Sequence, residues 1–293
     1  MSPGTTADRL ADLKGRRTVA VCLPALNEDA TVGGICAEVR RTLMAPAAGL
    51  VDDLLVLDDR STDRTRAVAE AAGARVVGTE EVLPEAGAGF GKGNALWKSL
   101  AATDADLIVW CDADLESFEA NYVTALLEPL LTDERIVLVK GYYERLLHGR
   151  PGGGRTTELM ARPLLAQFFP ELAHLRQPLG GEYAVRRDAA VQVPFVQGWG
   201  VEVGLLIDLS RRFGADRIAE ADLRIRRHRN RTPQELSPQA LAILQTVLQR
   251  AGVQPPPSGT GWSAELRAPG TEPRTVSLRE RPPLSDFGAP PSS

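Results

Sequence analysis

The stretch "DLIVWCDAD", Asp106 to Asp114, places two aspartates directly after a run of strand-forming apolar residues. A short apolar run bounded by polar residues is typical of a strand that is covered on both faces. Two carboxylates this close repel each other unless a positive charge lies between or beside them. We therefore expect Asp112 and Asp114 to mark the end of a buried strand and to belong to a site that holds a cation.

The segments around this stretch alternate between strand-like and helix-like patterns. We predict strands at 18–26, 52–59, 74–78, 106–114 and 135–143, with helices at 27–43, 61–73 and 91–103. This order is typical of an α/β fold with a mostly parallel sheet between two layers of helices. Ligands of such sheets bind at the carboxyl ends of the strands. Asn27 and Glu28 follow the first predicted strand, and Asp58 and Asp59 follow the second.

A glycine-rich break at 148–156 divides the chain, and the alternation is less regular beyond it. We predict helices at 157–169, 200–214 and 238–252, with Pro163 kinking or delaying the first of them, and strands at 180–187 and 217–228. The organisation expected is a region 1–147, a region 148–253 of the same domain, and a tail 254–293. Because the tail is rich in Pro, Gly and Ser, we expect it to be disordered.

Composition excludes several classes of protein. The chain has 293 residues, 43% of them hydrophobic, and a formal net charge of −4, as is usual for a globular protein. No apolar run approaches the roughly 20 residues of a membrane span, and the first residues lack the apolar core of a signal peptide. We expect a cytoplasmic protein with no membrane partner. The mild acidity argues against nucleic acid as a partner, and Cys22, Cys36 and Cys111 have neither disulfide nor zinc spacing.

Besides Asp112 and Asp114, four other motifs carry polar groups that could bind a nucleotide or another anionic ligand. Mg²⁺ or Mn²⁺ bound to a diphosphate would account for Asp112 and Asp114, because these ions prefer carboxylate and phosphate oxygens. Asp58 and Asp59 could accept hydrogen bonds from a nucleobase or a ribose, although the same run also suits a helix cap. The remaining motifs are Gly91-Lys92-Gly93, Gly152 to Thr157, and His228 within the basic run Arg224–Arg231.

Each of these three motifs has an ordinary structural alternative. Lys92 between glycines could approach a phosphate, or could belong to a plain loop. Arg155 with its neighbouring glycines and threonines could hold a second anion, or could be a flexible linker. The arginines around His228 lower its pKa by repulsion and keep it neutral, which suits a metal ligand, whereas a lone histidine is more often structural.

Taken together, these residues resemble the nucleotide-sugar glycosyltransferases with the GT-A fold. The resemblance rests on "PALNE" (24–28), "DDRSTD" (58–63), "GKGNALWKS" (91–99) and "DAD" (112–114). The later motifs "GGGRTTEL" (152–159), "QPLGGEYAVRR" (177–187), "GWGVEVGLLID" (198–208) and "RHRN" (227–230) are more specific. They resemble the retaining glucosyl-3-phosphoglycerate synthases, whose close relatives make the mannosyl product. The resemblance runs from about Val19 to Asn230.

The resemblance implies the fold, the reaction and the residues of the site. Region 1–147 would bind the nucleotide-sugar, and region 148–253 would bind the acceptor and complete the metal site. The residues implied for the nucleotide-sugar are Pro24, Ala25, Leu26, Asn27, Glu28, Asp59, Lys92, Asp112, Ala113, Trp199, Gly200, Val201 and Glu202. Those implied for the acceptor are Gly154, Arg155, Thr156, Thr157, Arg226 and Asn230, and those for Mg²⁺ or Mn²⁺ are Asp114 and His228. Asp114 and Glu202 would be catalytic, and relatives suggest a homodimer.

The expected reaction is transfer of glucose from UDP-glucose to the 2-hydroxyl of 3-phosphoglycerate with retention at the anomeric carbon. Glu202 is the candidate nucleophile, and a same-face attack assisted by the leaving phosphate is the alternative. Asp59 departs from some relatives, which have serine there, so the contact with the base can differ. Three rival functions remain: transfer of mannose from GDP-mannose, sugar transfer to a polyprenyl phosphate, and a nucleotide-sugar sensor without activity.

Overall fold

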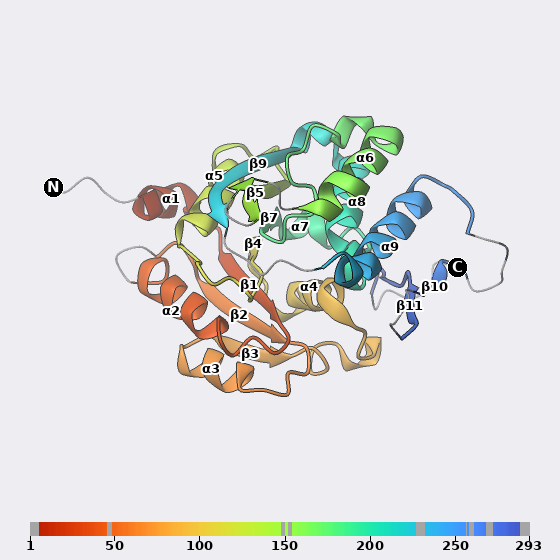
Figure 1. Ribbon diagram of the computed structural model, residues 1–293. Coiled ribbons are helices and arrows are strands. Elements are labelled where there is room, and N and C mark those ends of the chain that lie inside the picture. The colour runs from red at the N-terminus through yellow and green to blue at the C-terminus, as the bar shows by residue number, and fades with distance from the viewer. Residues whose placement is uncertain are drawn as a thin grey trace.

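The fold is a twisted α/β sheet with helices on both faces (Figure 1). The computed structural model describes residues 6–45, 49–147, 150–151, 154–226, 232–255, 257, 261–267 and 272–287. The main sheet has eight strands in the order β3-β2-β1-β4-β7-β5-β6, with β9 also paired to β5. The α/β fold class predicted from the sequence is confirmed.

The strands of the main sheet fall into a parallel half and a mixed half. The parallel half comprises β3 (Arg75–Gly78), β2 (Asp53–Asp58), β1 (Val19–Ala25) and β4 (Leu107–Trp110). The mixed half comprises β7 (Tyr183–Arg186), β5 (Leu138–Leu147), β6 (Arg150–Pro151) and β9 (Ile218–Arg226). β7 lies between β4 and β5 and runs antiparallel to both. Regions 1–147 and 148–253 therefore contribute strands to one sheet.

Alternate residues of the strands feed two apolar cores, one on each face of the sheet. In β1, Ala20 and Cys22 belong to one core, and Val19, Val21 and Leu23 belong to the other. The helices against the first core are α4 (Gly91–Ala102), α6 (Arg162–Phe168), α7 (Arg187–Ala190), α8 (Val201–Phe213) and α9 (Pro233–Arg250). Those against the second are α1 (Thr6–Lys14), α2 (Val32–Thr42), α3 (Thr65–Ala71) and α5 (Asn121–Thr132). This two-sided burial explains why the parallel strands read as continuous apolar runs.

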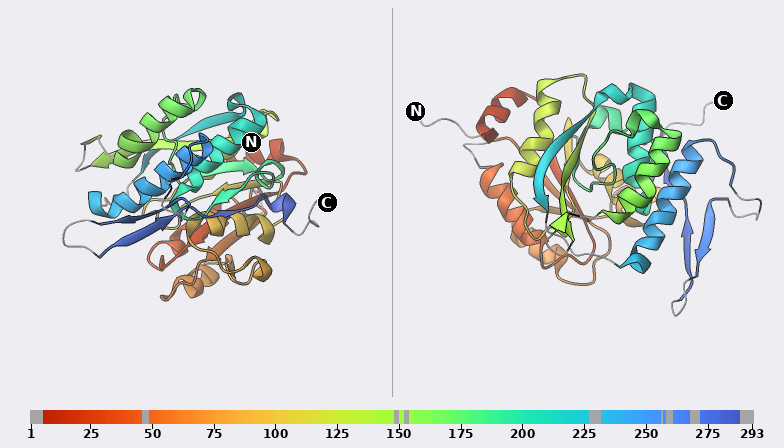
Figure 2. Two further views of the ribbon diagram at one scale, coloured as in Figure 1. Left: turned by 90° about the vertical axis from the view of Figure 1, so that its right-hand side faces the viewer. Right: turned by 45° about the horizontal axis from the view of Figure 1, so that its top comes forward.

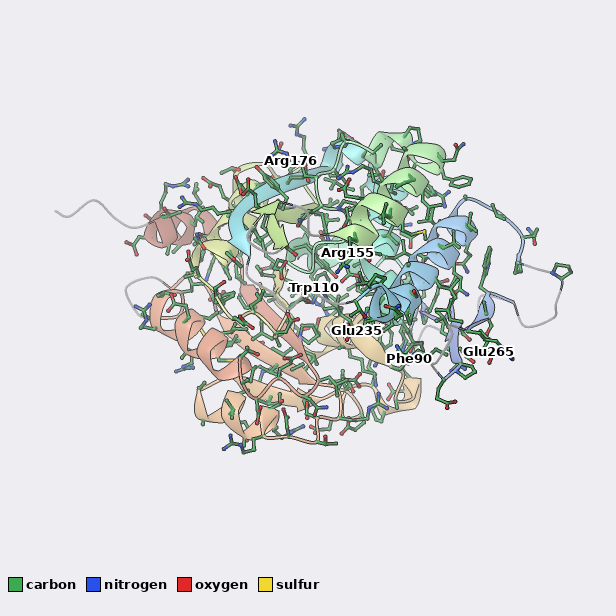
Figure 3. All side chains as sticks on the ribbon, in the orientation of Figure 1. Phe90, Trp110, Arg155, Arg176, Glu235 and Glu265 are labelled. Atoms are coloured by element: carbon green, nitrogen blue, oxygen red, sulfur yellow. The ribbon has the colours of Figure 1, made fainter. Side chains whose placement is uncertain are left out.

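Trp110 lies at the centre of the molecule, where the last residue of β4 meets the first core (Figure 3). Its indole is fully buried and packs edge-on against the ring of Tyr183 at 5.3 Å between centroids. The indole nitrogen donates to the hydroxyl of Ser99 at 2.8 Å. β4 is thereby fixed immediately before Asp112 and Asp114. The three cysteines are free and buried, as the sequence predicts.

Three predicted helices begin at different residues from those expected, and one of them, predicted from residue 61, begins at Thr65. The first, predicted from residue 27, begins at Val32 because the φ of Asn27 is 58°, a left-handed conformation outside any α-helix. The last, predicted from residue 238, begins at Pro233. Thr232 and Glu235 form a capping box there, and proline is well tolerated in the first turn of a helix.

Pro163 lies in the first turn of α6 (Arg162–Phe168), so the regular α-helix starts later than the predicted residue 157, in line with the predicted delay. A single π-helical turn (η2, Thr157–Ala161) precedes the proline, and α6 begins at Arg162. Thr157 is buried in this turn. The turn leads directly out of the glycine-rich break, so that residues 154–157 are followed by a packed element.

The tail corrects the sequence prediction of disorder over 254–293. Strands β10 (Ser263–Leu266) and β11 (Arg274–Ser277) form an antiparallel hairpin, and β12 (Glu280–Arg281) pairs with β8 (Phe195–Val196). The hairpin runs beside α9 (Figure 2), where the side-chain amide of Gln245 donates to the carbonyl of Val276 at 3.2 Å. Composition failed here because pairing with distant segments, which composition does not encode, orders the described part of the tail.

Within the parts of the chain that the structure describes, no helix combines the length and the hydropathy that crossing a bilayer requires.

Candidate active site

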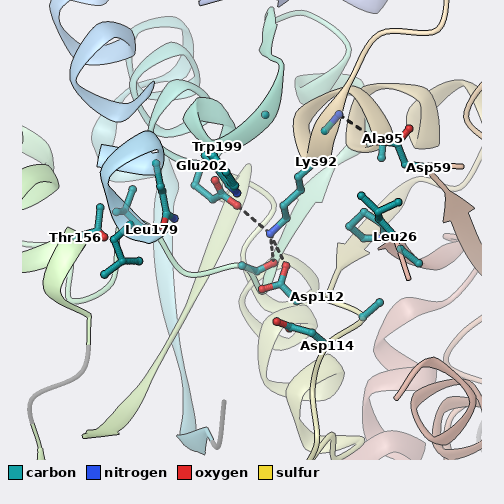
Figure 4. Close-up of a pocket in the computed structure, with 18 of the residues that line it drawn as sticks. Leu26, Asp59, Lys92, Ala95, Asp112, Asp114, Thr156, Leu179, Trp199 and Glu202 are labelled. Atoms are coloured by element: carbon teal, nitrogen blue, oxygen red, sulfur yellow. Dashed lines mark hydrogen bonds and ion pairs between the residues drawn. The ribbon is translucent and has the colours of Figure 1, made fainter. Parts of the chain in front are cut away.

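A cavity of about 570 Å³ opens at the carboxyl ends of β1, β2 and β4 (Figure 4). Its walls also include the start of α4, the start of α8 and the turn that follows residue 153. The predicted site residues that line it are Pro24, Ala25, Leu26, Glu28, Asp59, Lys92, Asp112, Ala113, Asp114, Gly154, Arg155, Thr156, Thr157, Trp199 and Glu202. The two halves of the chain therefore meet in one cavity, at the edge of the sheet where ligands are expected.

Asp59 stands at the end of β2 and is held by groups from three segments. Its Oδ2 accepts a hydrogen bond from the backbone nitrogen of Gly91 at 3.2 Å. Its Oδ1 accepts from the hydroxyl of Thr79 at 3.0 Å and from the guanidinium of Arg60 at 2.9 Å. Asp59 is only 7% exposed and lines the cavity. Its hydrogen bond from Gly91 fixes the start of α4 against the end of β2.

Asn27 is not among the residues that line the cavity, in contrast to its neighbours in "PALNE". Its side-chain oxygen accepts from the backbone nitrogen of Thr62 at 2.8 Å, and its backbone nitrogen donates to the hydroxyl of Ser61 at 3.0 Å. The side chain thus joins the loop after β1 to the loop after β2. Its role in this structure is to shape the two loops that frame the pocket.

Lys92 supplies the positive charge that the aspartates at the end of β4 require. Its ammonium lies 2.5 Å from Asp112 Oδ1 and 2.9 Å from Glu202 Oε1, and donates to the carbonyl of Gly181 at 3.4 Å (Figure 4). Burial lowers the pKa of Lys92, but the charges of Asp112 and Glu202 outweigh burial and hold the pKa well above the usual lysine value. Lys92 is therefore a permanent cation at the centre of the cavity.

The floor of the cavity is the turn Leu179–Gly181, a feature that motif reasoning did not assign to the site. Beneath it lies the fully buried Lys140, whose ammonium donates to the carbonyl of Gly180 at 2.6 Å and lies 4.0 Å from the centroid of the Tyr183 ring. Burial lowers the pKa of Lys140 to about 7. A lysine directly after the apolar run 136–139, inside a predicted strand, was the signal that could have drawn attention to this turn.

Gly181 is in close contact with Asp112, and this contact leads to a first prediction. A Cβ atom at position 181 would lie 2.1 Å from Asp112 Oδ2. We expect Gly181→Ala to push the carboxylate of Asp112 away from Lys92 and to lower kcat/KM by about a hundredfold, the size of a 1 Å misplacement. Steady-state kinetics with a thermal melt measures both effects.

Gly34 in α2 offers the matched control, because a Cβ there would meet no atom within 4 Å. We expect Gly34→Ala to keep full activity and to gain roughly 0.5–1 kcal/mol of stability from the better helix propensity of alanine. Wild-type kinetics in Gly181→Ala would show that the position of Asp112 does not matter to the reaction.

The opposite side of the cavity is formed by residues 154–157 and by one face of α9. Gly154 has a left-handed φ of 83°, which suits glycine at the turn into the helix. Leu236 and Gln239 of α9 complete this wall, and sequence reasoning had assigned neither to the site. Neither residue belongs to a recognised motif, although both follow the motif at 227–230 within ten residues. Arg155, labelled in Figure 3, also lines the cavity.

Trp199 lines the cavity and is 41% exposed, whereas the next two predicted residues belong to the core. Val201 is fully buried, and a Cβ at Gly200 would lie 2.3 Å from the hydroxyl of Thr246. Gly200 therefore allows the start of α8 to pack against α9. Gly200 and Val201 are not among the residues that line the cavity, and they lie between Trp199 and Glu202, which do. Their predicted contact with the sugar stays a prediction.

Three predicted residues lie in or beside the segment 227–231, which is outside the described residues. His228 and Asn230 belong to that segment, and Arg226 ends β9, where its backbone pairs with that of Arg145. β9 is the neighbour of β5, and Thr232 is the N-cap of α9. The predicted ligation by His228 stays a prediction.

The donor set at the end of β4 suits a hard divalent cation. Asp112 and Asp114 contribute carboxylates, and no group of three or more His, Cys, Asp or Glu side chains with metal-site geometry occurs in the described part of the chain. A closed zinc site would need four such ligands. Mg²⁺ and Mn²⁺ need only one or two carboxylates when phosphate oxygens complete the coordination. The residues present fit a metal that arrives with a diphosphate.

Comparison with known proteins places this geometry among characterised enzymes. The family model described as Glycosyl transferase family 2 matches residues 20–180. The glucosyl-3-phosphoglycerate synthase of Mycolicibacterium smegmatis is 47% identical over 292 residues, covering 97% of this chain and 94% of that protein. The enzyme of the same name from Mycolicibacterium paratuberculosis is 45% identical, covering 96% of this chain and 88% of the relative.

Solved structures of the Mycobacterium tuberculosis glucosyl-3-phosphoglycerate synthase have the same fold. Its complex with Mn²⁺, UDP-glucose and phosphoglyceric acid superposes with a TM-score of 0.87 at 45% identity, covering 97% of this chain and 96% of the other. Its complex with Mn²⁺, UDP and glucosyl-3-phosphoglycerate gives 0.85 at the same identity and with 97% of each chain covered. A further complex contains Mg²⁺ and UDP.

Proposed function

Since the chain belongs to glycosyl transferase family 2 and, within it, to the glucosyl-3-phosphoglycerate synthases, we infer that it transfers glucose from UDP-glucose to 3-phosphoglycerate. The product is glucosyl-3-phosphoglycerate, and the cofactor is Mg²⁺ or Mn²⁺. 3-Phosphoglycerate has a single hydroxyl group, at carbon 2, so glucose is transferred to that oxygen. The observation that carries this function is one cavity that joins the acidic strand ends to the Gly154–Thr157 turn.

The nucleotide end of the cavity is assigned to the carboxyl ends of β1 and β2. We propose that Pro24, Ala25, Leu26, Glu28 and Asp59 surround the uridine. Support comes from their common position on one wall, beside the start of α4. Asp59 already accepts hydrogen bonds from Gly91 and Thr79, so its carboxylate is oriented before the donor binds.

At the reacting centre, the residues of this chain hold charge in place. Lys92 lies where it stabilises negative charge on the departing UDP, and Asp112 holds Lys92 in that position. When bound, Mg²⁺ or Mn²⁺ supplies further neutralisation of the diphosphate, and Asp114 with His228 are the proposed ligands. Trp199 covers the sugar and limits access of water.

Glu202 is proposed to act through its charge and not as a nucleophile. Its carboxylate is 7% exposed and paired with Lys92 at 2.9 Å, which reduces the electron density available for attack on the anomeric carbon. A same-face attack by the acceptor hydroxyl then accounts for retention, with Glu202 stabilising positive charge that develops on the sugar. A glucosyl adduct on Glu202, detected by mass spectrometry of quenched enzyme, would contradict this assignment.

The acceptor is assigned to the opposite wall. Gly154, Arg155, Thr156 and Thr157 all line this wall, and a guanidinium beside two hydroxyl-bearing residues suits a phosphate or a carboxylate. Asn230 and Arg226 are proposed to assist them. A homodimer in the cytoplasm, with neither nucleic acid nor membrane as partner, also belongs to this proposal, and light scattering of the purified protein tests the dimer.

An activity assay with donor and acceptor panels tests the function. We expect UDP-glucose and 3-phosphoglycerate with Mn²⁺ to give glucosyl-3-phosphoglycerate, and EDTA to remove the activity until Mn²⁺ is restored in excess. GDP-mannose and a polyprenyl phosphate serve as the alternative donor and acceptor. Faster transfer from GDP-mannose would make the protein a mannosyltransferase, and nucleotide-sugar binding without turnover would make it a sensor.

A further inference from the structure

The tail reaches back to the nucleotide end of the active site through one buried arginine. We propose that Arg281 is a positioning residue: it fixes the segment Ala86–Asn94, from which Phe90, Gly91 and Lys92 enter the cavity. The inference rests on the proposed function for the identity of the ligand, and on the contacts below for the role of the arginine.

The guanidinium of Arg281 is surrounded by acceptors of this one segment. Nε donates to the side-chain oxygen of Asn94 at 2.8 Å, Nη2 donates to the carbonyl of Gly87 at 2.9 Å, and Nη1 donates to the carbonyl of Ala86. The side chain is 8% exposed, and its charged end lies 5.3 Å from the ring centroid of Trp97. No carboxylate among the described residues forms an ion pair with it. The hydrogen bonds of its side chain are therefore made to the Ala86–Asn94 segment.

The held segment has little rigidity of its own. Gly87, Gly89 and Gly91 adopt left-handed φ angles of 73°, 65° and 71°. A chain with three such glycines loses much conformational entropy when it is fixed, so its order requires contacts from outside. Within the segment, the side-chain amide of Asn94 donates to the carbonyl of Ala88 at 2.9 Å, and Arg281 orients that same Asn94 from outside.

Packing at Gly89 shows how closely the arginine fits. A Cβ atom at Gly89 would lie 2.2 Å from Arg281 Nη2 and 2.1 Å from Asn94 Oδ1. The arginine, the asparagine and the glycine backbone therefore occupy a space that excludes even one more methyl group. A side chain in such contact restricts the path of the loop as well as its hydrogen bonds.

The same stretch of tail also supports the facing wall of the cavity. Arg281 pairs with Phe195 in the short β12–β8 ladder. Just after β8, the backbone nitrogen of Gln197 donates to the carbonyl of Arg279 at 2.8 Å. The side chain of Gln197 then accepts from the backbone nitrogen of Phe90 at 3.0 Å. The tail thus links the Ala86–Asn94 segment to the wall that carries Trp199.

Loss of Arg281 is expected to weaken binding of the nucleotide-sugar donor and to leave binding of the acceptor unchanged. Gly91 donates to Asp59, and Lys92 bridges Asp112 and Glu202, so both depend on the path of the held segment. If loss of the arginine leaves that segment in its binding conformation one tenth of the time, the apparent affinity for the nucleotide falls about tenfold. The acceptor wall at 154–157 has no contact with Arg281 among those described.

The experiment compares Arg281→Met, Arg281→Lys and wild type in steady-state kinetics, UDP binding and amide hydrogen exchange. We expect Arg281→Met to raise KM for UDP-glucose and the Kd of UDP about tenfold, with KM for 3-phosphoglycerate within twofold. Exchange in 84–91 is expected to quicken at least tenfold. Arg281→Lys keeps a donor and should give intermediate values. Arg267→Met, which removes an exposed arginine directly after β10, is the matched control and should match wild type.

Two further readouts keep the proposal open to refutation. If Arg281→Met does not fold, Gly89→Ala disturbs the same contact from the loop, and wild-type UDP affinity in Gly89→Ala and Arg281→Lys would overturn the proposal. Equal rises in both KM values, or unchanged exchange in 84–91, would also overturn it. If wild type transfers no glucose, the proposed function fails, whereas UDP affinity and hydrogen exchange still test the role of Arg281.

Discussion

We expect the Lys92→Met variant to lose transferase activity by on the order of a thousandfold in kcat/KM, because one preorganised charge at a reacting centre is worth that much. The variant removes the cation that lies 2.5 Å from Asp112 and 2.9 Å from Glu202. Two effects add: charge on the departing UDP loses a partner, and the two carboxylates lose the cation they share. Steady-state kinetics with UDP-glucose measures the sum of both effects.

A double variant separates these two effects. Lys92→Met alone leaves two buried or half-buried carboxylates near one another, and we expect roughly 1–3 kcal/mol of lost stability. Adding Glu202→Gln removes one negative charge while keeping the shape of the side chain. The melting temperature should then recover in part, whereas activity should stay low because both the cation and the charge of Glu202 are missing. Recovery of both would show that Lys92 serves only to neutralise Glu202.

The control for this series is Arg64→Met, which removes an exposed cation from the same half of the molecule. The side chain of Arg64 is 83% exposed and lies 3.6 Å from Asp29. Exposed ion pairs contribute little, so kinetics and stability should match wild type. A Lys92→Met enzyme with rates like those of Arg64→Met would mean that the centre of the cavity is not the reacting centre.

The parallel half of the fold could be predicted because its signals are local. The strands β1, β2, β3 and β4 each appear as an apolar run, and the polar residues after β1, β2 and β4 mark one edge of the sheet. The insertion of β7 between β4 and β5 was not predictable in this way. It depends on pairing of Tyr183 with both Trp110 and Lys140. These contacts join residues more than 40 positions apart, and the local hydrophobic pattern of the sequence does not encode them.

The residues of the candidate site also fall into two groups: those that lie in local motifs and those that packing between distant elements brings to the cavity. Asp59, Lys92, Asp112 and Glu202 lie in motifs, and the structure brings them into one cavity. Leu236, Gln239 and the arginine at 281 act from segments without any motif, because their positions result from packing between distant elements. One compositional signal was available. The chain has only four lysines, and each is buried or half-buried, so every lysine marks a structural or functional contact.

The largest effect of a single carboxylate is expected at Asp114. Asp114 is exposed at the edge of the cavity, and it is the proposed protein ligand nearest the end of β4. Asp114→Asn keeps the size of the side chain and removes its charge. We expect kcat/KM to fall by on the order of a thousandfold, as loss of a charge-neutralising metal requires. The decisive measurement is the Kd of UDP with and without Mn²⁺, because the metal should strengthen UDP binding in wild type and not in the variant.

Asp112→Asn and Asp104→Asn give the comparison that isolates the metal from the fold. Asp112 is bonded to Lys92, so its variant should lower both activity and melting temperature. Asp104 has a fully exposed side chain, and its variant should change neither. Because Asp114 is exposed, its variant should lower activity with an unchanged melting temperature, a combination that only a ligand-binding role produces. If Mn²⁺ strengthens UDP binding equally in wild type and in Asp114→Asn, the metal is held elsewhere, and the carboxylates at the end of β4 would serve only to orient Lys92.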